Sequence, residues 1–275
     1  MILFNGKKVA EKILQDLKKD IAKAGARPAL ATILVGDSPE SLLYVSLKEK
    51  AAKEVGINFL KVRFPQGAGT DDVKKKIQEL NQDKSVDGIL VQLPLPSGCN
   101  QDEIVSEINS EKDVDGFHSK NQKLVPPLVG AILLAIKKSG DEDCGSQTEQ
   151  GKKAIALVNS EIFGQRLKLF SKKEGLELEY HIKKTCPSLA EEDLKAADIL
   201  ITTCGCPGMI RGEMIKQGAV LVDAGITRVA EKKVRGDVDA DSVRDKAGFL
   251  TPVPGGIGPM TVALLLRNVF LASQR

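Results

Sequence analysis

Three side chains suited to proton transfer and ligand binding follow one another in a short segment, at Ser41, Tyr44 and Lys48. Spacings of three and four residues place them on one face of a helix. A lysine can move a proton or polarise a substrate where its surroundings adjust its pKa or direct its ammonium group. The motif is short, and taken alone it favours an ordinary solvated helix face with a half-buried tyrosine.

A glutamine and an aspartate elsewhere in the chain have side chains that could bind a heterocycle. Gln92 lies at the carboxyl end of a predicted buried strand, where open α/β sheets place ligand-binding groups, and its amide both donates and accepts. Asp115, in the string 112–116, could accept two hydrogen bonds from an aminopyrimidine edge. The simpler interpretations are a strand-end amide bonded to backbone and an Asx turn.

A loop rich in proline and glycine precedes the last predicted helix. Three prolines and three glycines fall within the eleven residues 251–261. Gly255 and Gly256 let the backbone approach a ligand closely, and the prolines stiffen the loop. Amides at the start of the following helix would point into the loop and suit an anion or a polarised carbonyl. We therefore favour a ligand-binding loop over a purely structural turn.

The segment after the predicted strand Ala154–Val158 carries a weak signal for a dinucleotide. Such a strand normally ends in glycines that let a pyrophosphate reach the helix N-terminus, but here only Gly164 matches a glycine-rich pattern. Lys183 and Lys184 follow about 20 residues further on, where a base favours the 2′-phosphate of NADP. A solvated lysine pair explains them equally well.

The composition argues against several classes of function. The 275 residues include 40 Lys+Arg and 37 Asp+Glu, a formal charge of +3, which is too small for a nucleic-acid-binding surface. The two histidines, His118 and His181, cannot form a multi-histidine metal centre. No apolar run is long enough for a membrane span, and the first residues do not resemble a signal peptide.

The five cysteines show no paired CxxC spacing. This argues for a reducing compartment and against a disulfide framework or a zinc site. Cys204-Gly205-Cys206 is a poor match to a redox motif, and we interpret it as small residues that line a cleft.

Helical and strand patterns alternate along the chain, as in parallel sheets covered by helices. Ser38 and Pro39 should begin the second helix and Gly56 should end it. The expected fold is α/β with two domains, the second with a Rossmann-like parallel sheet. Helices are predicted at 7–24, 38–55, 71–80, 101–108, 131–138, 165–173, 188–195, 213–217 and 260–272, and strands at 29–35, 57–64, 88–93, 154–158, 176–180, 199–203 and 219–223.

Taken together, these motifs resemble the bifunctional methylenetetrahydrofolate dehydrogenase/cyclohydrolase family over nearly the whole chain. The order and spacing of the matching strings make a chance match untenable. They are Val35-Gly36-Asp37 with Ser41, Tyr44 and Lys48; Asp87-Gly88 with Val91-Gln92-Leu93-Pro94-Leu95-Pro96; Lys112-Asp113-Val114-Asp115-Gly116; Gly218-Ala219-Val220 with Asp223-Ala224-Gly225-Ile226; Gly236-Asp237-Val238-Asp239; and 251–261.

The resemblance implies two reactions in one cleft. The first is NADP-dependent oxidation of 5,10-methylenetetrahydrofolate to the methenyl form, and the second is hydrolysis of that form to 10-formyltetrahydrofolate. Lys48 would be the principal cyclohydrolase residue, positioned or adjusted by Gln92, while Tyr44 would stack on the folate rings and Asp115 would hold the pterin. The resemblance also places Ser41, Pro254, Gly255 and Gly256 at the folate, and Ser160, Gly164 and Ile226 at the cofactor. No metal is implied.

The resemblance further implies a domain organisation and an assembly. A folate-binding catalytic domain would cover residues 1–122 and a Rossmann-like NADP-binding domain residues 123–257, and the last helix, 258–275, would pack back on the first domain. Members are typically cytosolic homodimers in bacteria. We therefore expect a cytoplasmic homodimer with a small-molecule folate substrate, with NADP or else NAD as cofactor, and with no nucleic-acid or membrane partner.

The cofactor half departs from the family pattern, whereas the folate-site strings are intact. Where the family has Gly-Arg-Ser, this chain has Val158-Asn159-Ser160, which removes a glycine beside the phosphate and an arginine that would hold it. NADP would then bind through other contacts, such as Arg166 or Lys183 and Lys184. The alternative is a cyclohydrolase whose dehydrogenase activity is weakened or lost. A third hypothesis is a folate-binding protein without catalysis.

Overall fold

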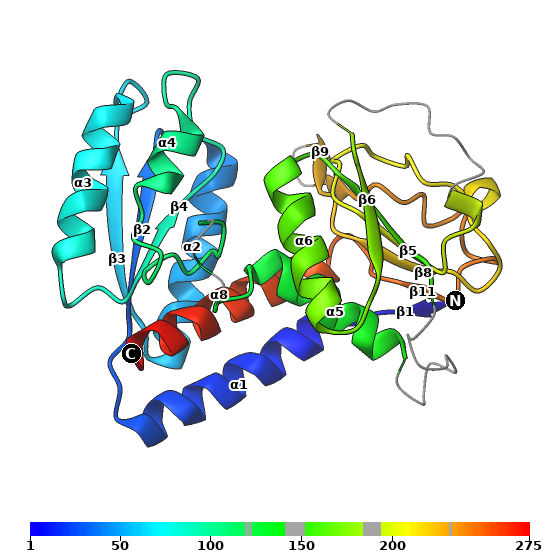
Figure 1. Cartoon of the computed structure of the whole chain (residues 1–275), viewed down its shortest axis with the longest axis horizontal. Coiled ribbons are helices and arrows are strands. Elements are labelled where there is room, and N and C mark those ends of the chain that lie inside the picture. Colours follow the sequence, from blue (N-terminus) through cyan, green and yellow to red (C-terminus); the bar gives the residue numbers. More distant parts are fainter. Residues whose placement is uncertain (119–120, 122, 141–151, 184–193, 231–232) are drawn as a thin grey trace. The chain divides into compact units, whose positions relative to one another are not determined.

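The computed structural model describes residues 1–118, 121, 123–140, 152–183, 194–230 and 233–275 (Figure 1). The chain divides into two compact units. The N-terminal unit comprises Ala10–Pro127 with Val262–Arg275, and the central unit comprises Met1–Val9 with Leu128–Thr261. Each unit contains a parallel sheet, which confirms the predicted α/β class.

A parallel sheet of three described strands forms the centre of the N-terminal unit. Its middle strand, β2 (Ala29–Val35), pairs with β3 (Asn58–Phe64) on one side and β4 (Gly88–Val91) on the other. Because side chains alternate along a strand, β2 and β4 contribute to two apolar cores, one on each face. The first core includes α3 (Thr70–Gln82) and α4 (Gln101–Ser106), and the second includes α1 (Gly6–Ala24), α2 (Pro39–Val55) and α8 (Ile257–Ser273).

The helix that carries the Ser41–Tyr44–Lys48 motif begins and ends where the sequence predicts. The Ser38 Oγ accepts a hydrogen bond of 3.3 Å from the Ser41 amide, and Pro39 is the first helical residue. Gly56 follows Val55 with a φ of 91°, the left-handed conformation that glycine adopts at low cost. These two signals fix the length of α2.

The central unit contains a larger parallel sheet. Its described strands lie in the order β1 (Ile2–Leu3), β11 (Phe249–Leu250), β8 (Val220–Asp223), β7 (Ile199–Thr202), β5 (Ala154–Val158) and β6 (Leu178–Ile182). The strand order reverses beside β5, whose neighbours are β6 and β7. Sheets of this kind bind ligands at such a switch point, beyond the carboxyl ends of the strands.

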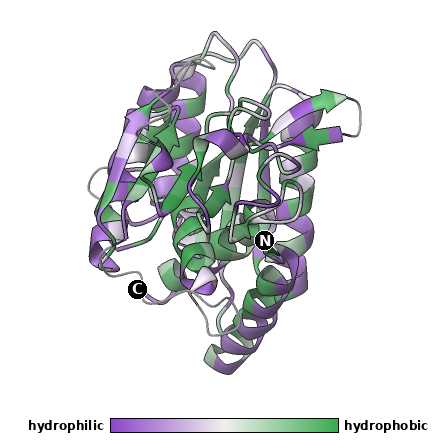
Figure 2. Cartoon of the chain, turned by 90° about the vertical axis from the view of Figure 1, so that its right-hand side faces the viewer, coloured by the Kyte–Doolittle hydropathy of each residue, from purple (hydrophilic) through white to green (hydrophobic). Residues whose placement is uncertain are grey.

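Helices and a hairpin complete the described part of the central unit. They are α5 (Pro127–Ser139), α6 (Glu161–Lys173), and the antiparallel strands β9 (Thr227–Ala230) and β10 (Lys233–Arg235). Figure 2 shows apolar residues concentrated along the strands and polar residues on the outer helix surfaces. None of the described helices is long and apolar enough to span a membrane.

Some elements differ from the sequence-based prediction. The helix expected at 213–217 is a single 3₁₀ turn, Gly212–Met214, because Gly212 is held from two sides: its amide donates to Ser242 Oγ (3.2 Å) and its carbonyl accepts from Lys246 Nζ (3.0 Å). The strand expected at 176–180 lies two residues later, and most of the helix expected at 188–195 lies outside the described residues. Cys206 is disulfide-bonded, which the cysteine spacing did not predict, whereas Cys99 and Cys204 are free thiols.

Candidate active site

Lys48 and Gln92, which are 44 residues apart in sequence, meet in the N-terminal unit. Lys48 lies on α2 and Gln92 directly follows β4. The Lys48 Nζ donates to the Gln92 Oε1 over 2.8 Å, and the Gln92 Nε2 donates to the Leu93 carbonyl over 2.7 Å. The second bond sets the orientation of the amide, so its oxygen faces Lys48. This geometry holds a lysine nitrogen at a defined point, as a proton carrier requires.

The charges around Lys48 adjust its protonation. Burial lowers the pKa of Lys48, and the Asp115 carboxylate opposes this shift by favouring the ammonium form. Burial likewise raises the pKa of Asp115 to about 6, against the attraction of Lys48. The two groups therefore interact electrostatically, and both change protonation closer to neutral pH than in water.

The loop that carries Asp115 is fixed by its neighbour Asp113, which is fully buried. The Asp113 carboxylate accepts hydrogen bonds from the amides of Gly116 (3.0 Å) and His118 (2.8 Å). Gly116 has a φ of 74°, which a residue with a side chain rarely adopts. The Asx turn that the sequence suggested is thus made by Asp113. Among the described residues, none donates a hydrogen bond to the Asp115 carboxylate, so it can accept bonds from a ligand.

Two asparagines missed by the sequence analysis complete this support. Asn121 Nδ2 donates to the Asp113 carbonyl over 2.7 Å. Asn268, on α8, donates from Nδ2 to the carbonyls of Val114 and Val125, both over 2.9 Å, and only 4% of it is exposed. Asn268 thereby ties the last helix to both sides of the Asp115 loop. The available signal was an amide within an otherwise apolar stretch of the predicted last helix.

Ser41 and Tyr44 lie on the same helix as Lys48. Tyr44 is one turn before Lys48 and 36% exposed, in a position to contact a planar ligand. Ser41 is buried at the start of α2, where its amide takes part in the Ser38 cap. The structure brings Lys48, Gln92 and Asp115 together; the binding roles of Ser41 and Tyr44 stay predictions.

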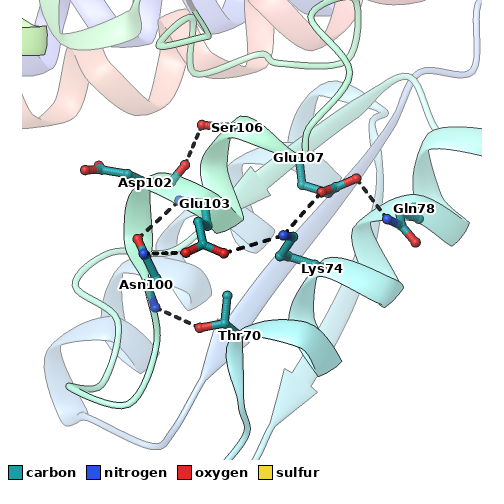
Figure 3. Close-up of polar contacts among 8 residues, drawn as sticks. All are labelled: Thr70, Lys74, Gln78, Asn100, Asp102, Glu103, Ser106 and Glu107. Carbon is teal, nitrogen blue, oxygen red and sulfur yellow. Dashed lines mark hydrogen bonds and ion pairs between the residues drawn. The ribbon is translucent and has the colours of Figure 1, made fainter.

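The segment that leaves Gln92 is anchored at its far end by a polar network between α3 and α4 (Figure 3). The Asn100 side chain caps α4 by accepting from the Glu103 backbone amide, and the Asn100 backbone amide donates to Thr70 Oγ1 over 2.9 Å. Lys74 on α3 forms ion pairs with Glu103 on α4 (3.5 Å) and with Glu107, which directly follows α4 (3.9 Å). The Leu93-Pro94-Leu95-Pro96 run is therefore held between the Gln92 amide and this network.

Pro254, Gly255 and Gly256 belong to the central unit and form a tight turn. Gly255 has a φ of 106°, and a Cβ on Gly256 would lie 2.7 Å from the Pro252 carbonyl oxygen. Glycine is therefore required at both positions by the turn itself. The predicted place of these residues at the folate stays a prediction.

The predicted cofactor residues lie at the carboxyl edge of the central sheet. Ser160 caps α6, since its Oγ accepts from the Phe163 amide over 3.4 Å, and Ile226 is 51% exposed after β8. A Cβ on Gly164 would come within 2.5 Å of the Tyr180 ring, so its small size serves helix packing. Val158 is fully buried, so its branched side chain lies in the core of the central unit.

The surroundings of α6 fit a dinucleotide without the family's arginine. The α6 N-terminus offers amides to an anion, and the Thr203 Oγ1 after β7 is buried without a partner in the described residues. Arg166 is buried with its guanidinium over the Phe170 ring, and Lys184 lies outside the described residues. An open pocket of about 600 Å³ beside β6 is lined by Glu161, Lys168, Glu179, Tyr180, His181, Ile182 and Lys183. No group of three or more potential metal-ligating His, Cys, Asp or Glu residues occurs in the described ranges.

Comparison with known proteins agrees with this geometry. Residues 4–115 match the catalytic domain of the tetrahydrofolate dehydrogenase/cyclohydrolase family, and residues 143–275 match its NAD(P)-binding domain. The Bifunctional protein FolD of Halothermothrix orenii is 39% identical over 286 residues, covering 99% of this chain and 98% of that protein.

Two solved structures share the whole architecture. The bifunctional FolD enzyme of Campylobacter jejuni superposes with a TM-score of 0.89 at 35% identity, covering 100% of this chain and 99% of that one. The Trypanosoma brucei FolD, solved with NADP and an inhibitor, has a TM-score of 0.89 at 30% identity, covering 100% of this chain and 97% of that one. The chain therefore belongs to the tetrahydrofolate dehydrogenase/cyclohydrolase family, and it is an enzyme with both activities that give the family its name.

Proposed function

We propose that Lys48 is the proton carrier of the hydrolytic step, in which methenyltetrahydrofolate becomes 10-formyltetrahydrofolate. The observation that carries this proposal is the 2.8 Å hydrogen bond between Lys48 Nζ and Gln92 Oε1, beside the Asp115 carboxylate. The oxygen of water bonds to the methenyl carbon, and the bond from that carbon to N5 breaks. One proton of the water ends on N5 and the other is released. Lys48 moves these protons, and its lowered pKa gives it access to the neutral form that accepts one.

Asp115 and Tyr44 bind the substrate in this proposal. The Asp115 carboxylate accepts hydrogen bonds from the aminopyrimidine edge of the pterin, and the Tyr44 ring stacks on the folate. The supporting observations are the Asp115 carboxylate without a described hydrogen-bond donor and the partial exposure of Tyr44 one turn from Lys48. Ser41, Pro254, Gly255 and Gly256 complete the folate site.

The oxidative step requires alignment rather than acid–base chemistry. The bond between the methylene carbon and hydrogen breaks with its electron pair, and bound NADP supplies the nicotinamide that accepts this hydride. We propose that the α6 N-terminus with Ser160, Gly164 and Ile226 positions the cofactor, with NADP preferred over NAD. The cations Lys168 and Lys183 in the pocket beside β6 support this preference, since the 2′-phosphate is an anion.

We also propose a cytoplasmic homodimer with domains at 1–122 and 123–257 and a returning helix at 258–275. In the described sheet of the N-terminal unit, β3 is an edge strand with Leu60 41% exposed, which suits a subunit interface. Sedimentation of the purified protein measures the assembly, and a purely monomeric species at micromolar concentration would contradict it.

Lys48→Met tests the proton carrier. We expect the rate of methenyltetrahydrofolate hydrolysis to fall roughly 10²- to 10⁴-fold, the range in which general acid–base groups contribute. Lys50→Met, on the exposed side of the same helix, is the matched control. Retention of hydrolysis in Lys48→Met would refute the assignment. Formation of NADPH from NADP, or of NADH from NAD, with methylenetetrahydrofolate tests the oxidative step, and the absence of both reduced dinucleotides would leave only a cyclohydrolase.

A further inference from the structure

Two buried aspartates in the central unit take no part in the reactions described above. Asp223 ends β8 and is 2% exposed, and Asp237 follows β10 and is 0% exposed. They belong to the strings 223–226 and 236–239, and the two aspartates are 14 residues apart along the chain. Burying two carboxylates is energetically costly unless both accept hydrogen bonds. The donors to each carboxylate therefore show which parts of the backbone it fixes.

Asp237 gathers the turn that follows β7. Its Oδ2 accepts hydrogen bonds from Thr202 Oγ1 (2.6 Å) and from the amides of Cys204 (2.7 Å) and Gly205 (3.2 Å). Its Oδ1 accepts from the amide of Cys206 over 2.6 Å. Four donors thus converge on one carboxylate, three of them successive backbone amides. A neutral asparagine has a single carbonyl oxygen and cannot accept all four in this arrangement.

The Asp223 carboxylate accepts hydrogen bonds from the turn that follows β8 and from the backbone at Asp237. Its Oδ1 accepts from the amides of Gly225 (3.0 Å) and Asp237 (3.1 Å), and its Oδ2 accepts from the amide of Val238 (2.9 Å). Thr251 Oγ1 accepts from the Asp223 amide and donates to its carbonyl. Burial, with a smaller contribution from the nearby Asp237, raises the pKa of Asp223 to about 7, although the backbone hydrogen bonds to its carboxylate oppose this shift.

Two glycines leave room for the hydrogen-bonded carboxylates of Asp223 and Asp237, which we call the clamp. A Cβ at Gly225 would overlap the Asp237 carboxylate, and a Cβ at Gly236 would overlap the Asp223 carboxylate. Each aspartate therefore requires a glycine: Asp237 requires Gly225, and Asp223 requires Gly236. This accounts for two sequence strings that neither the hydrolytic nor the oxidative residues explain.

The clamp lies at the carboxyl ends of β7 and β8, where a sheet of this topology receives its ligand. We propose that Asp223 and Asp237 are positioning residues for the dinucleotide: they preset the turns 204–206 and 224–226 that receive the half of the cofactor beside β7 and β8. The exposed Ile226, directly after the clamped Gly225, would be the side chain that this arrangement presents. The inference rests on the proposed dehydrogenase function.

Asp237→Asn in the full-length enzyme tests the inference, with NADP and NAD as probes in titration calorimetry. We expect the Kd for NADP to rise at least tenfold, and the KM for NADP to rise with it while the KM for the folate stays within twofold. Asp239→Asn is the matched control: it lies in the same string, but its carboxylate accepts from the Ser242 amide and not from the clamp. The hydrolysis rate reports only on the N-terminal unit, which contains Lys48, so a cooperative thermal unfolding transition is measured for each variant to show that the central unit is folded.

Thr202→Val provides a second, milder variant if Asp237→Asn does not fold, because it removes only one of the four donors to Asp237. It should raise the Kd for NADP severalfold. Unchanged affinity in a folded clamp variant, with or without a lower melting temperature, would show a merely structural role and overturn the inference. A wild-type enzyme that binds neither dinucleotide would instead overturn the proposed dehydrogenase function, and the inference with it.

Discussion

Folate affinity should depend on pH through Asp115. Burial raises the pKa of this carboxyl from its ordinary value of 3.8 to about 6. Asp115 accepts hydrogen bonds from the pterin only in the ionised form, so affinity is full above its pKa and is lost as the pH falls through it. At pH 5 about one tenth of the carboxyl is ionised, which lowers the affinity about tenfold from its value at pH 7.5. An unshifted aspartate would give no such loss above pH 5.

Calorimetric titration of a stable folate, such as folic acid, between pH 5 and pH 8 measures this dependence. Asp115→Asn should remove it, because the amide does not titrate, and should lower the affinity roughly ten- to hundredfold at pH 7.5, since a hydrogen bond to a charged group contributes about 1.5–3 kcal/mol. Protonation of the ligand affects both proteins equally and cancels in the comparison.

Asp87→Asn is the matched control for this experiment. Burial also raises the pKa of Asp87, but its carboxylate accepts from the Ala29 amide at the opposite end of the sheet, so the variant should keep the wild-type pH dependence. No loss of affinity in the wild type between pH 7.5 and pH 5, or the same loss in Asp115→Asn, would refute the reasoning.

Two further predictions concern the support of the site and of α6. Asn268→Ala leaves the buried carbonyls of Val114 and Val125 without their donor, so the free energy of unfolding in urea should fall by roughly 2–5 kcal/mol, whereas Ser273→Ala on the same helix should change it by less than about 1 kcal/mol. A loss below about 1 kcal/mol in Asn268→Ala would contradict the assigned hydrogen bonds. Gly164→Ala forces a Cβ against the Tyr180 ring and should cost about 1–3 kcal/mol, while Gly67→Ala, which meets no atom within 4 Å, should be neutral. Equal melting temperatures for these two glycine variants would show that α6 can shift to admit the methyl group.

Local signals predicted most of the fold. The strands Ala29–Val35 and Ala154–Val158 have the predicted bounds, because a buried strand of a parallel sheet is an uninterrupted apolar run. The start and end of α2 followed from Ser38, Pro39 and Gly56. In contrast, the segment after Arg211 has a helical pattern but forms only a 3₁₀ turn, because contacts from residues about thirty positions later hold Gly212.

The residues of the candidate site could be predicted only where the type of side chain itself indicates a chemical role. Lys48, Gln92 and Asp115 could be named from motifs, and their meeting is now visible as one hydrogen bond and one electrostatic interaction. The support could not be named, because Asn268 bonds to a carbonyl 154 residues away and no local pattern encodes that distance. The roles of Asp223 and Asp237 are hidden in the sequence for the same reason, because their donors lie up to 35 residues away.

The contribution of α8 to the N-terminal unit has a consequence for biosynthesis. A ribosome makes the chain from residue 1 onward, so β2, β4 and the Asp115 loop emerge well before Leu265, Leu266 and Val269, which complete their apolar core. Asn268 arrives in the same late stretch. The apolar core of the nascent N-terminal unit therefore stays incomplete and partly exposed while residues 128–261 of the central unit are translated. Premature termination before α8 yields a polypeptide that lacks these core residues and the Asn268 hydrogen bonds to the Asp115 loop.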